Sequence, residues 1–268
     1  DEFIEAESAP LEAENIEYFA HRREHARTDW DNGGLPRPEW EALLVEMMRR
    51  ADAAGHLRYA LPEVVGGRGG SNLDMAVIRE HLAARGLGLH NDLQNETSVV
   101  GNFPFILMML AKGTEAQQAE FIDGAFNRTH LVAFGLTEPG HGSDATFLDT
   151  KAVRRGGSWV INGTKRFNTG MHRATHDMVF ARTGGAAGDA DGITCFIVPT
   201  ATAGVKIGTY WWTFNMPTDH PDVHFTDVVV GEDAVFGEVG RGLELANIFV
   251  HENRIRQAAS SLGAAQFC

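Results

Sequence analysis

The chain has 268 residues, of which 43% are hydrophobic, enough for one large domain or for two smaller ones with cores of their own. Its formal net charge of −13 argues against a nucleic-acid surface, because phosphate binding needs clustered Lys and Arg. The two cysteines, Cys195 and Cys268, give neither a disulfide framework nor the spacing of metal ligands, so no metal site is expected from them.

The sequence shows no sign of a membrane or export segment. No apolar run approaches the roughly 20 residues that a membrane-spanning helix needs. The acidic start, DEFIEAESAPLEAE, has neither the basic nor the apolar region of a signal peptide. We therefore expect no transmembrane segment and a cytoplasmic location.

Residues 1–130 show mainly helical patterns, and we expect them to form an N-terminal helical domain. Pro38 suits the first turn of a helix that Gly55 ends. The apolar stretch 99–113 predicts a helix that is buried on several sides. Two capping boxes predict further helix starts, at Ser71 with Asp74 and at Thr114 with Gln117.

Residues 131–240 carry seven short runs rich in β-branched and aromatic residues, separated by Gly, Asp, Asn and Pro. Because no helical pattern lies between the runs, they predict a middle antiparallel β-sandwich or barrel. Residues 241–268 turn helical again and continue without a breaker until Gly263. The expected class is α+β, and we expect this last helix to pack against further helices that lie outside the chain or come from another one.

The stretch AFGLTEPGHGSDATFLD, residues 133–149, is a candidate ligand loop that follows a strand. Thr137 lies at the predicted strand end, and the backbone N–H groups of Gly142 and Ser143 with the serine hydroxyl could grip a phosphate. A tight turn in which Ser and Asp cap their own backbone explains the same residues. No GxGxxG or Walker pattern lies between a strand and a helix, which disfavours a Rossmann or P-loop site.

A second candidate stretch, WVINGTKRFNTG, begins at residue 159. Its Asn162–Gly163 pair is typical of a type I′ hairpin turn. On the strand expected after that turn, Phe167 and Thr169 lie two residues apart and therefore on one face. A flat aromatic ligand could stack on the first and hydrogen-bond to the second.

Taken together, these pieces resemble the acyl-CoA dehydrogenase family of flavoproteins. The order is helices, TEPxxGSD, INGxK with an aromatic and a Thr, and a helical restart with an Arg, and it includes the PEVVGGRGG turn at 62–70. The resemblance covers nearly the whole chain. It implies an N-terminal helical domain at 1–130, a middle β-domain at 131–240 and, at 241–268, the first helix of a C-terminal bundle through which subunits form a tetramer or dimer.

The resemblance also implies an FAD between the middle domain and the C-terminal helices. The matching positions near the flavin ring are Phe134, Leu136, Thr137, the stacking aromatic Phe167 and Thr169 at the reactive edge. Gly142 and Ser143 match the pyrophosphate loop, and Ser143 is also expected near the substrate.

The implied reaction is the α,β-dehydrogenation of an acyl-CoA thioester, with electrons passed to an electron-transferring flavoprotein. It needs a carboxylate base, which the family places in the C-terminal domain or directly before an Arg on its first helix. Here Asn253 precedes Arg254, and Glu252 is rotated by about 100° from that position, so Glu252 is a weak candidate and the base is expected beyond Cys268.

Other positions match the family's substrate contacts. His251, Glu252, Asn253 and Arg254 match the segment that meets the acyl-CoA, although a surface helix turn explains them as well. Glu96 and Val100 match the bottom of the acyl cavity.

Several residues depart from the family pattern. His141 and Phe147 replace small residues, and Asn168 replaces an apolar one. His220, Asp222 and His224 alternate, which could bind a metal but more simply gives the polar face of a strand, and we predict no metal. A flavin-dependent oxidase or monooxygenase, or a truncated non-catalytic scaffold protein, remain alternatives to the dehydrogenase.

Overall fold

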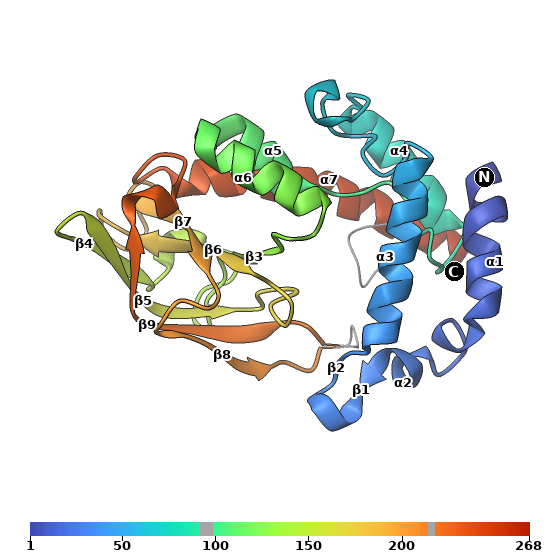
Figure 1. The fold of residues 1–268 in the computed structure, drawn as a ribbon, viewed down its shortest axis with the longest axis horizontal. Coiled ribbons are helices and arrows are strands. Elements are labelled where there is room, and N and C mark those ends of the chain that lie inside the picture. The colour runs from blue at the N-terminus through green and yellow to red at the C-terminus, as the bar shows by residue number, and fades with distance from the viewer. Residues whose placement is uncertain (92–98, 214–217) are drawn as a thin grey trace. The chain divides into compact units, whose positions relative to one another are not determined.

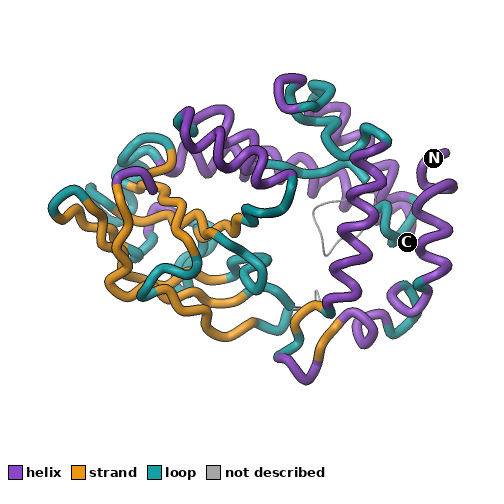
Figure 2. Tube along the Cα trace, in the orientation of Figure 1, coloured by secondary structure: helices purple, strands orange, loops and turns teal. Residues whose placement is uncertain are grey.

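A computed structural model describes residues 1–91, 99–213 and 218–268 (Figures 1 and 2). Contacts divide the chain into two compact units. The helical unit comprises Asp1–Pro104, Trp212–Thr218 and Val250–Cys268, and the sheet unit comprises Phe105–Trp211 and Asp219–Phe249. The domain boundaries expected near residues 130 and 240 stay a prediction. No described helix is both long and apolar enough to cross a membrane.

The helical unit is built around the helix α3, as its sequence predicts. Its elements are α1 (Ala9–Glu14), α2 (Arg23–Arg27), β1 (Thr28–Asp29), β2 (Leu35–Pro36), α3 (Pro38–Ala53) and α4 (Asn72–Ala84). Pro38 is the first residue of α3, and Gly55 follows its end with a positive φ of 74°. Trp40, Leu43 and Met47 recur at helical spacing and are buried against Leu11 and Tyr18.

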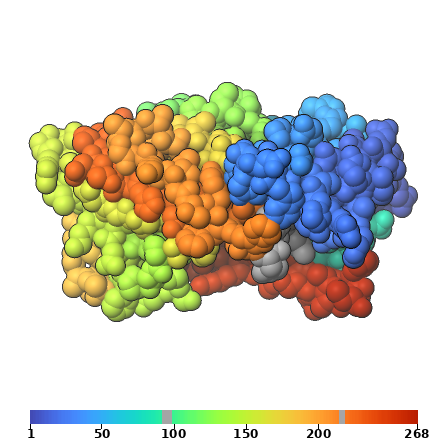
Figure 3. All heavy atoms as spheres, turned by 90° about the horizontal axis from the view of Figure 1, so that it is seen from below, coloured from blue at the N-terminus to red at the C-terminus, as the bar shows by residue number. Residues whose placement is uncertain are grey.

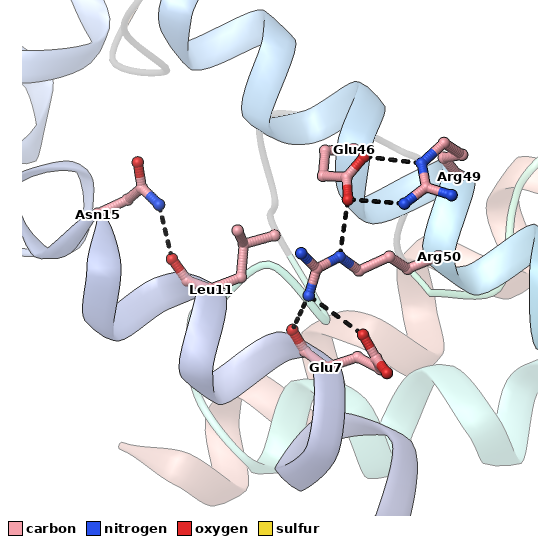
Figure 4. A network of polar contacts seen from close by, with 6 residues as sticks. All are labelled: Glu7, Leu11, Asn15, Glu46, Arg49 and Arg50. Atoms are coloured by element: carbon pink, nitrogen blue, oxygen red, sulfur yellow. Dashed lines mark hydrogen bonds and ion pairs between the residues drawn. The ribbon is translucent and has the colours of Figure 1, made fainter.

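A chain of ion pairs links the first turns of the protein to α3 (Figure 4). Arg50 donates from Nη1 to Glu7 Oε2 at 3.1 Å and from Nε to Glu46 Oε1 at 2.9 Å. Hydrogen bonds from Arg49 and Arg50 hold the pKa of Glu46 at about 2. Because these side chains are partly or largely exposed, each pair contributes less than about 1 kcal/mol, and the apolar core stabilises this unit more.

Both capping boxes are confirmed. The Ser71 hydroxyl accepts from the Asp74 N–H and the Asp74 carboxylate accepts from the Ser71 N–H, so α4 starts where predicted. Thr114 and Gln117 do the same for α6 (Glu115–Phe126). The helix expected over 99–113 is shorter: α5 spans Pro104–Lys112, because a proline favours extended backbone at the residue before it.

The sheet unit holds one hydrogen-bonded sheet with the strand order β10-β7-β6-β4-β5-β9-β8, and β3 also pairs with β6. The strands are β3 (Val132–Gly135), β4 (Lys151–Arg155), β5 (Ser158–Arg166), β6 (His176–Arg182), β7 (Ile193–Pro199), β8 (Val205–Tyr210), β9 (Pro221–Gly231) and β10 (Val235–Phe236). Most pairs are antiparallel as predicted, but β3 and β4 run parallel to β6. Among the described strands the sheet does not close into a barrel.

The sheet folds over on itself into two layers. Trp159 on β5 and Phe196 on β7 have ring centroids 5.4 Å apart, although β4 and β6 separate these strands in the sheet. The fold occurs where β4 meets β6 at a single pair, Lys151 with Arg182. The sandwich-like core predicted for this region therefore forms between β5 and β9 on one side and β6 and β7 on the other (Figure 1).

Strand β6 is buried on both faces. Val179 and Ala181 point into the core between the layers, whereas Met178 and Phe180 join a second core. That second core includes residues of α5, α6 and the start of α7 (Gly242–Phe267). The strand's near-continuous apolar run follows from this double burial.

The hairpin between β4 and β5 differs from the prediction. Its turn is Gly156–Gly157, with φ values of 55° and 83°, and not Asn162–Gly163. Asn162 and Gly163 form a bulge inside β5, where a Cβ on Gly163 would lie 2.6 Å from the Cα of Thr150. A residue pair that tolerates unusual backbone suits a bulge as well as a turn, which is why the prediction was wrong.

The helical restart is confirmed by α7. The C-terminal part of α7 lies at the surface, in dark red in Figure 3. Apolar side chains of that part, including Ile255, Leu262 and Phe267, are exposed. A helix with such a face is typical of one that packs against further helices.

Candidate functional site

A loop leaves and rejoins the same edge of β6, and it carries most of the predicted ligand residues. Strand β3 ends at Gly135, opposite Val179, and β4 begins at Lys151, opposite Arg182. Residues 136–150 are therefore an excursion between two strands that share one edge of β6. The loop therefore lies where the sheet folds over, at the contact between β4 and β6.

The carboxylate of Glu138 closes the base of this loop. It accepts hydrogen bonds from the backbone N–H groups of Asp149 and Thr150, at 2.5 and 3.0 Å. Lys165 Nζ on β5 lies 2.7 Å from the same carboxylate and also donates to the Leu136 carbonyl at 3.2 Å. Both Glu138 and Lys165 are buried, so the two ends of the loop are held by a water-excluded ion pair.

Glu138 is ionised in this arrangement. Burial raises the pKa of its carboxyl, but the charge and hydrogen bond of Lys165, with the two backbone donors, lower it more, and the net pKa lies below the ordinary value. The sequence analysis did not identify this pair. A signal existed, since Lys165 follows Trp159 and Ile161 on the inward face of β5.

Arg182 anchors the far end of the loop. Its Nη2 donates to the Thr146 carbonyl at 2.6 Å and to the Asp189 carbonyl at 3.2 Å, and its Nη1 donates to the Gly184 carbonyl at 3.1 Å. Asp144 accepts from the Thr146 N–H at 3.0 Å. With both ends held, residues 139–143 are the part that projects, and most of them are exposed.

The projecting segment offers free donors. In the described chain, no residue hydrogen-bonds the Ser143 hydroxyl or the backbone N–H groups of Gly142 and Ser143. A Cβ placed on Gly140 or Gly142 would meet nothing within 4 Å, so the backbone is open to approach. Adjacent free N–H groups and a hydroxyl are groups that could bind a phosphate or pyrophosphate.

Strand β3 contributes backbone more than side chains. The Phe134 ring packs against Phe180 and Phe249, at centroid distances of 5.1 and 4.4 Å, and so belongs to the core. The Leu136 carbonyl is used by Lys165, and the Thr137 carbonyl accepts from the Arg166 N–H at 2.8 Å. Thr137 itself is half-buried.

Phe167 and Thr169 do not share a strand face, so that prediction was wrong. Strand β5 ends at Arg166, and Phe167 has a φ of 62°, in the left-handed region. A bulky residue there is strained by about 1–3 kcal/mol, which is a common feature of functional positions. The turn nevertheless leaves the Phe167 ring 46% exposed and Thr169 exposed, with Asn168 buried between them.

Asn168 is paired with a buried carboxyl. Its Nδ2 donates to Asp177 on β6 at 2.6 Å, and a Cβ on Gly135 would lie 3.0 Å from Asp177 Oδ1. Burial raises the pKa of Asp177 to about 7. This polar pair therefore lies next to Gly135, the last residue of β3.

The alternating residues of β9 and its approach are engaged by protein groups. Arg166 binds Asp222 through two hydrogen bonds of 2.8 and 2.9 Å and lowers its pKa, and His224 Nδ1 lies 3.1 Å from the Thr164 hydroxyl. His220 Nδ1 lies 3.0 Å from the Thr169 hydroxyl. This arrangement supports the simpler interpretation, a polar strand face.

In the loop, His141, which departs from the family pattern, stacks on Phe147 with ring centroids 5.9 Å apart. Its Nε2 lies 3.8 Å from an Asp149 carboxylate oxygen.

Apart from Ser143, the predicted substrate residues belong to the helical unit. Glu252 Oε2 accepts from Arg256 at 2.8 Å, and Asn253 accepts from Asn102 Nδ2 at 2.7 Å. Arg256 is buried and also hydrogen-bonds Asn102. Glu252 is therefore engaged by an arginine one turn along α7, which weakens it further as a base.

The remaining predicted substrate positions differ in their exposure. His251 and Arg254 are exposed on α7, and Val100 is buried. Glu96 lies outside the described residues.

Replacing Lys165 tests the clamp at the base of the loop. Lys165→Met leaves the buried Glu138 charge without its partner, and we expect the free energy of unfolding to fall by about 3–5 kcal/mol. Arg154→Met removes the exposed pair with Glu232 and should cost less than about 1 kcal/mol. Urea denaturation of both variants measures the difference, and equal losses would contradict a buried clamp.

Asp177 gives a pH-dependent prediction. Its pKa is raised in the folded protein, so folding binds a proton between about pH 4 and pH 7 and stability falls as pH rises through that range. Asp177→Asn removes this penalty and keeps an acceptor for Asn168. We expect its stability relative to wild type to rise by roughly 2–4 kcal/mol between pH 4 and pH 8. The exposed Asp31→Asn should show no such rise, and a flat difference for Asp177→Asn would refute the assignment.

Comparison with known proteins agrees with this geometry. A family model described as the acyl-CoA dehydrogenase N-terminal domain matches residues 2–128, and one described as the acyl-CoA dehydrogenase middle domain matches residues 133–228. The mitochondrial isobutyryl-CoA dehydrogenase of Dictyostelium discoideum is 32% identical over 227 residues, which are 83% of this chain and 52% of the relative.

Two further relatives share these regions. CarC of Acetobacterium woodii, a subunit of the caffeyl-CoA reductase-Etf complex, is 28% identical over 222 residues, 82% of this chain and 57% of the relative. The structure of butyryl-CoA dehydrogenase from Megasphaera elsdenii aligns with a TM-score of 0.70 and 26% identity, covering 96% of this chain and 63% of that one. The chain thus spans about half the length of the curated relatives it matches. It belongs to the acyl-CoA dehydrogenase family.

Proposed function

We propose that the protein is an FAD-dependent acyl-CoA dehydrogenase, an oxidoreductase that acts on CH–CH groups. It would convert an acyl-CoA thioester to its 2,3-enoyl form and pass the electrons to an electron-transferring flavoprotein. The relatives support this choice, since they include dehydrogenases of isobutyryl- and butyryl-CoA and a subunit of an Etf complex.

One observation carries the proposal: the clamped loop that presents free donors. The Glu138–Lys165 pair and Arg182 fix both ends of residues 136–150, while Gly142 and Ser143 keep unused N–H and O–H groups. Holding donors rigid before a ligand arrives lowers the entropy cost of binding it. Gly142 and Ser143 would hold the pyrophosphate of an FAD, and Thr137, Phe167 and Thr169 would hold its flavin ring.

The chemistry divides between cofactor and protein. Bound FAD would accept a hydride from the β-carbon of the thioester, and a carboxylate base would take the α-proton. This chain's part is to bind, to orient and to exclude water. Because Glu252 is held by Arg256, we propose that the base comes from outside these 268 residues.

The proposed substrate contacts are Ser143 in the loop, Val100 and Glu96, and the α7 segment His251, Glu252, Asn253 and Arg254. We also propose a homo-oligomer, a tetramer or dimer, which the exposed apolar side chains of α7 support. Each of these assignments extends the family resemblance to this chain.

Anaerobic titration tests the proposed reaction. The full-length protein with bound FAD is mixed with acyl-CoA thioesters of increasing chain length in the absence of oxygen. We expect one of them to bleach the flavin absorbance and to yield its 2,3-enoyl product. An oxidase would bleach equally but recolour rapidly when oxygen is admitted, and a protein that no thioester bleaches is not a dehydrogenase.

Ser143→Ala tests the phosphate loop. Removing the hydroxyl deletes one hydrogen bond to the pyrophosphate, so the Kd for FAD should rise by about 2- to 10-fold. Ser158→Ala, at the start of β5, should leave the Kd unchanged. Fluorescence titration of the apoprotein gives both constants, and the same Kd in both variants would exclude Ser143 from the site.

A further inference from the structure

Three side chains lie in hydrogen-bond contact at the end of β5. The Thr169 hydroxyl oxygen is 3.0 Å from His220 Nδ1, and the same nitrogen is 3.0 Å from a carboxylate oxygen of Asp219. The side chains of His220 and Asp219 are only 19% and 17% exposed. None of the family-derived positions includes Asp219 or His220.

The backbone fixes this contact. Strands β5 and β9 pair Arg166 with Asp222, and the pairing continues past the strained Phe167. The Gly170 N–H donates to the Asp219 carbonyl at 3.1 Å, and the Trp211 N–H donates to the His220 carbonyl at 3.1 Å. Bonds on both sides therefore hold His220 opposite Thr169.

The chemistry of the contact sets the direction of the threonine hydroxyl. A carboxylate beside Nδ1 favours the histidine tautomer that carries its proton on Nδ1. This one N–H is shared between the Asp219 carboxylate and the Thr169 oxygen, and a protonated nitrogen cannot accept, so the threonine hydroxyl must direct its own hydrogen elsewhere. The alternative acceptor, the Phe167 carbonyl, is 3.5 Å away and weak. The hydroxyl hydrogen is thus available to a ligand on the exposed side of Thr169.

We propose that His220, backed by Asp219, is a positioning residue that keeps the Thr169 hydroxyl oriented as a donor toward the flavin. This inference rests on the proposed function, which places Thr169 at the reactive edge of FAD. It assigns a task to the β8–β9 approach, the part of the sequence that departs most from the family pattern.

The test compares two replacements of His220 in the full-length protein. His220→Phe keeps a ring but removes the nitrogen, and we expect the Kd for FAD to rise about 2- to 10-fold and the visible absorption maximum of bound FAD to shift. His220→Asn puts an amide N–H near the position of Nδ1, so it should restore most of the wild-type Kd and spectrum. His224→Phe, on β9 beside Thr164, is the matched control and should change neither.

Nitrogen-15 spectra of the histidine rings supply a readout that does not depend on FAD. Wild type should show His220 protonated on Nδ1, and Asp219→Asn should move the proton toward Nε2. An unchanged Kd and spectrum in His220→Phe, or an equal change in His224→Phe, overturns the inference while leaving the proposed function intact. A wild-type protein that binds no FAD overturns the proposed function and this assignment together.

Discussion

The buried pair of Glu138 and Lys165 is the interaction on which the site depends. Burying two charges costs several kcal/mol each, and attraction alone seldom offsets that cost. Here the carboxylate also receives two backbone N–H groups and the ammonium reaches the Leu136 carbonyl, so most of the lost hydration is replaced. The pair holds together the two ends of the loop that joins β3 to β4 along β6.

The fixed base of the loop explains why hydrogen-bond donors at its tip stay unused. Glu138 and Arg182 hold the loop, and His141 exchanges two backbone hydrogen bonds with Glu138, so the tip is held without using the donors of Gly142 and Ser143. Gly142 and Ser143 can then keep donors that folding would otherwise use. Unused donors on a fixed backbone are what an anionic ligand requires, so the stability of the clamp and the binding capacity of the tip are two results of one arrangement.

Local chemistry predicted much of this fold. Capping boxes, Pro38 and the helical restart were confirmed because each depends on a few neighbouring residues. The parallel pairing of β3 with β6 could not be predicted, since it joins segments some 40 residues apart through the folding of the sheet. The motif points to Thr137 and Ser143, whose roles stay predictions, whereas the conformation of Phe167 was missed because the bulge at Gly163 and the end of β5 shift the backbone.

Two neighbouring residues after the end of β5, Asn168 and Thr169, each contact a polar side chain from another part of the sheet unit. Asn168 in place of an apolar residue introduces a buried amide, which is costly without a partner, and Asp177 supplies one from β6. One residue further, Thr169 meets His220. The buried amide at position 168 thus creates a requirement for a polar partner at position 177, on strand β6. The effect of a replaced residue at this turn therefore depends on the polar partner that faces it as much as on the residue itself.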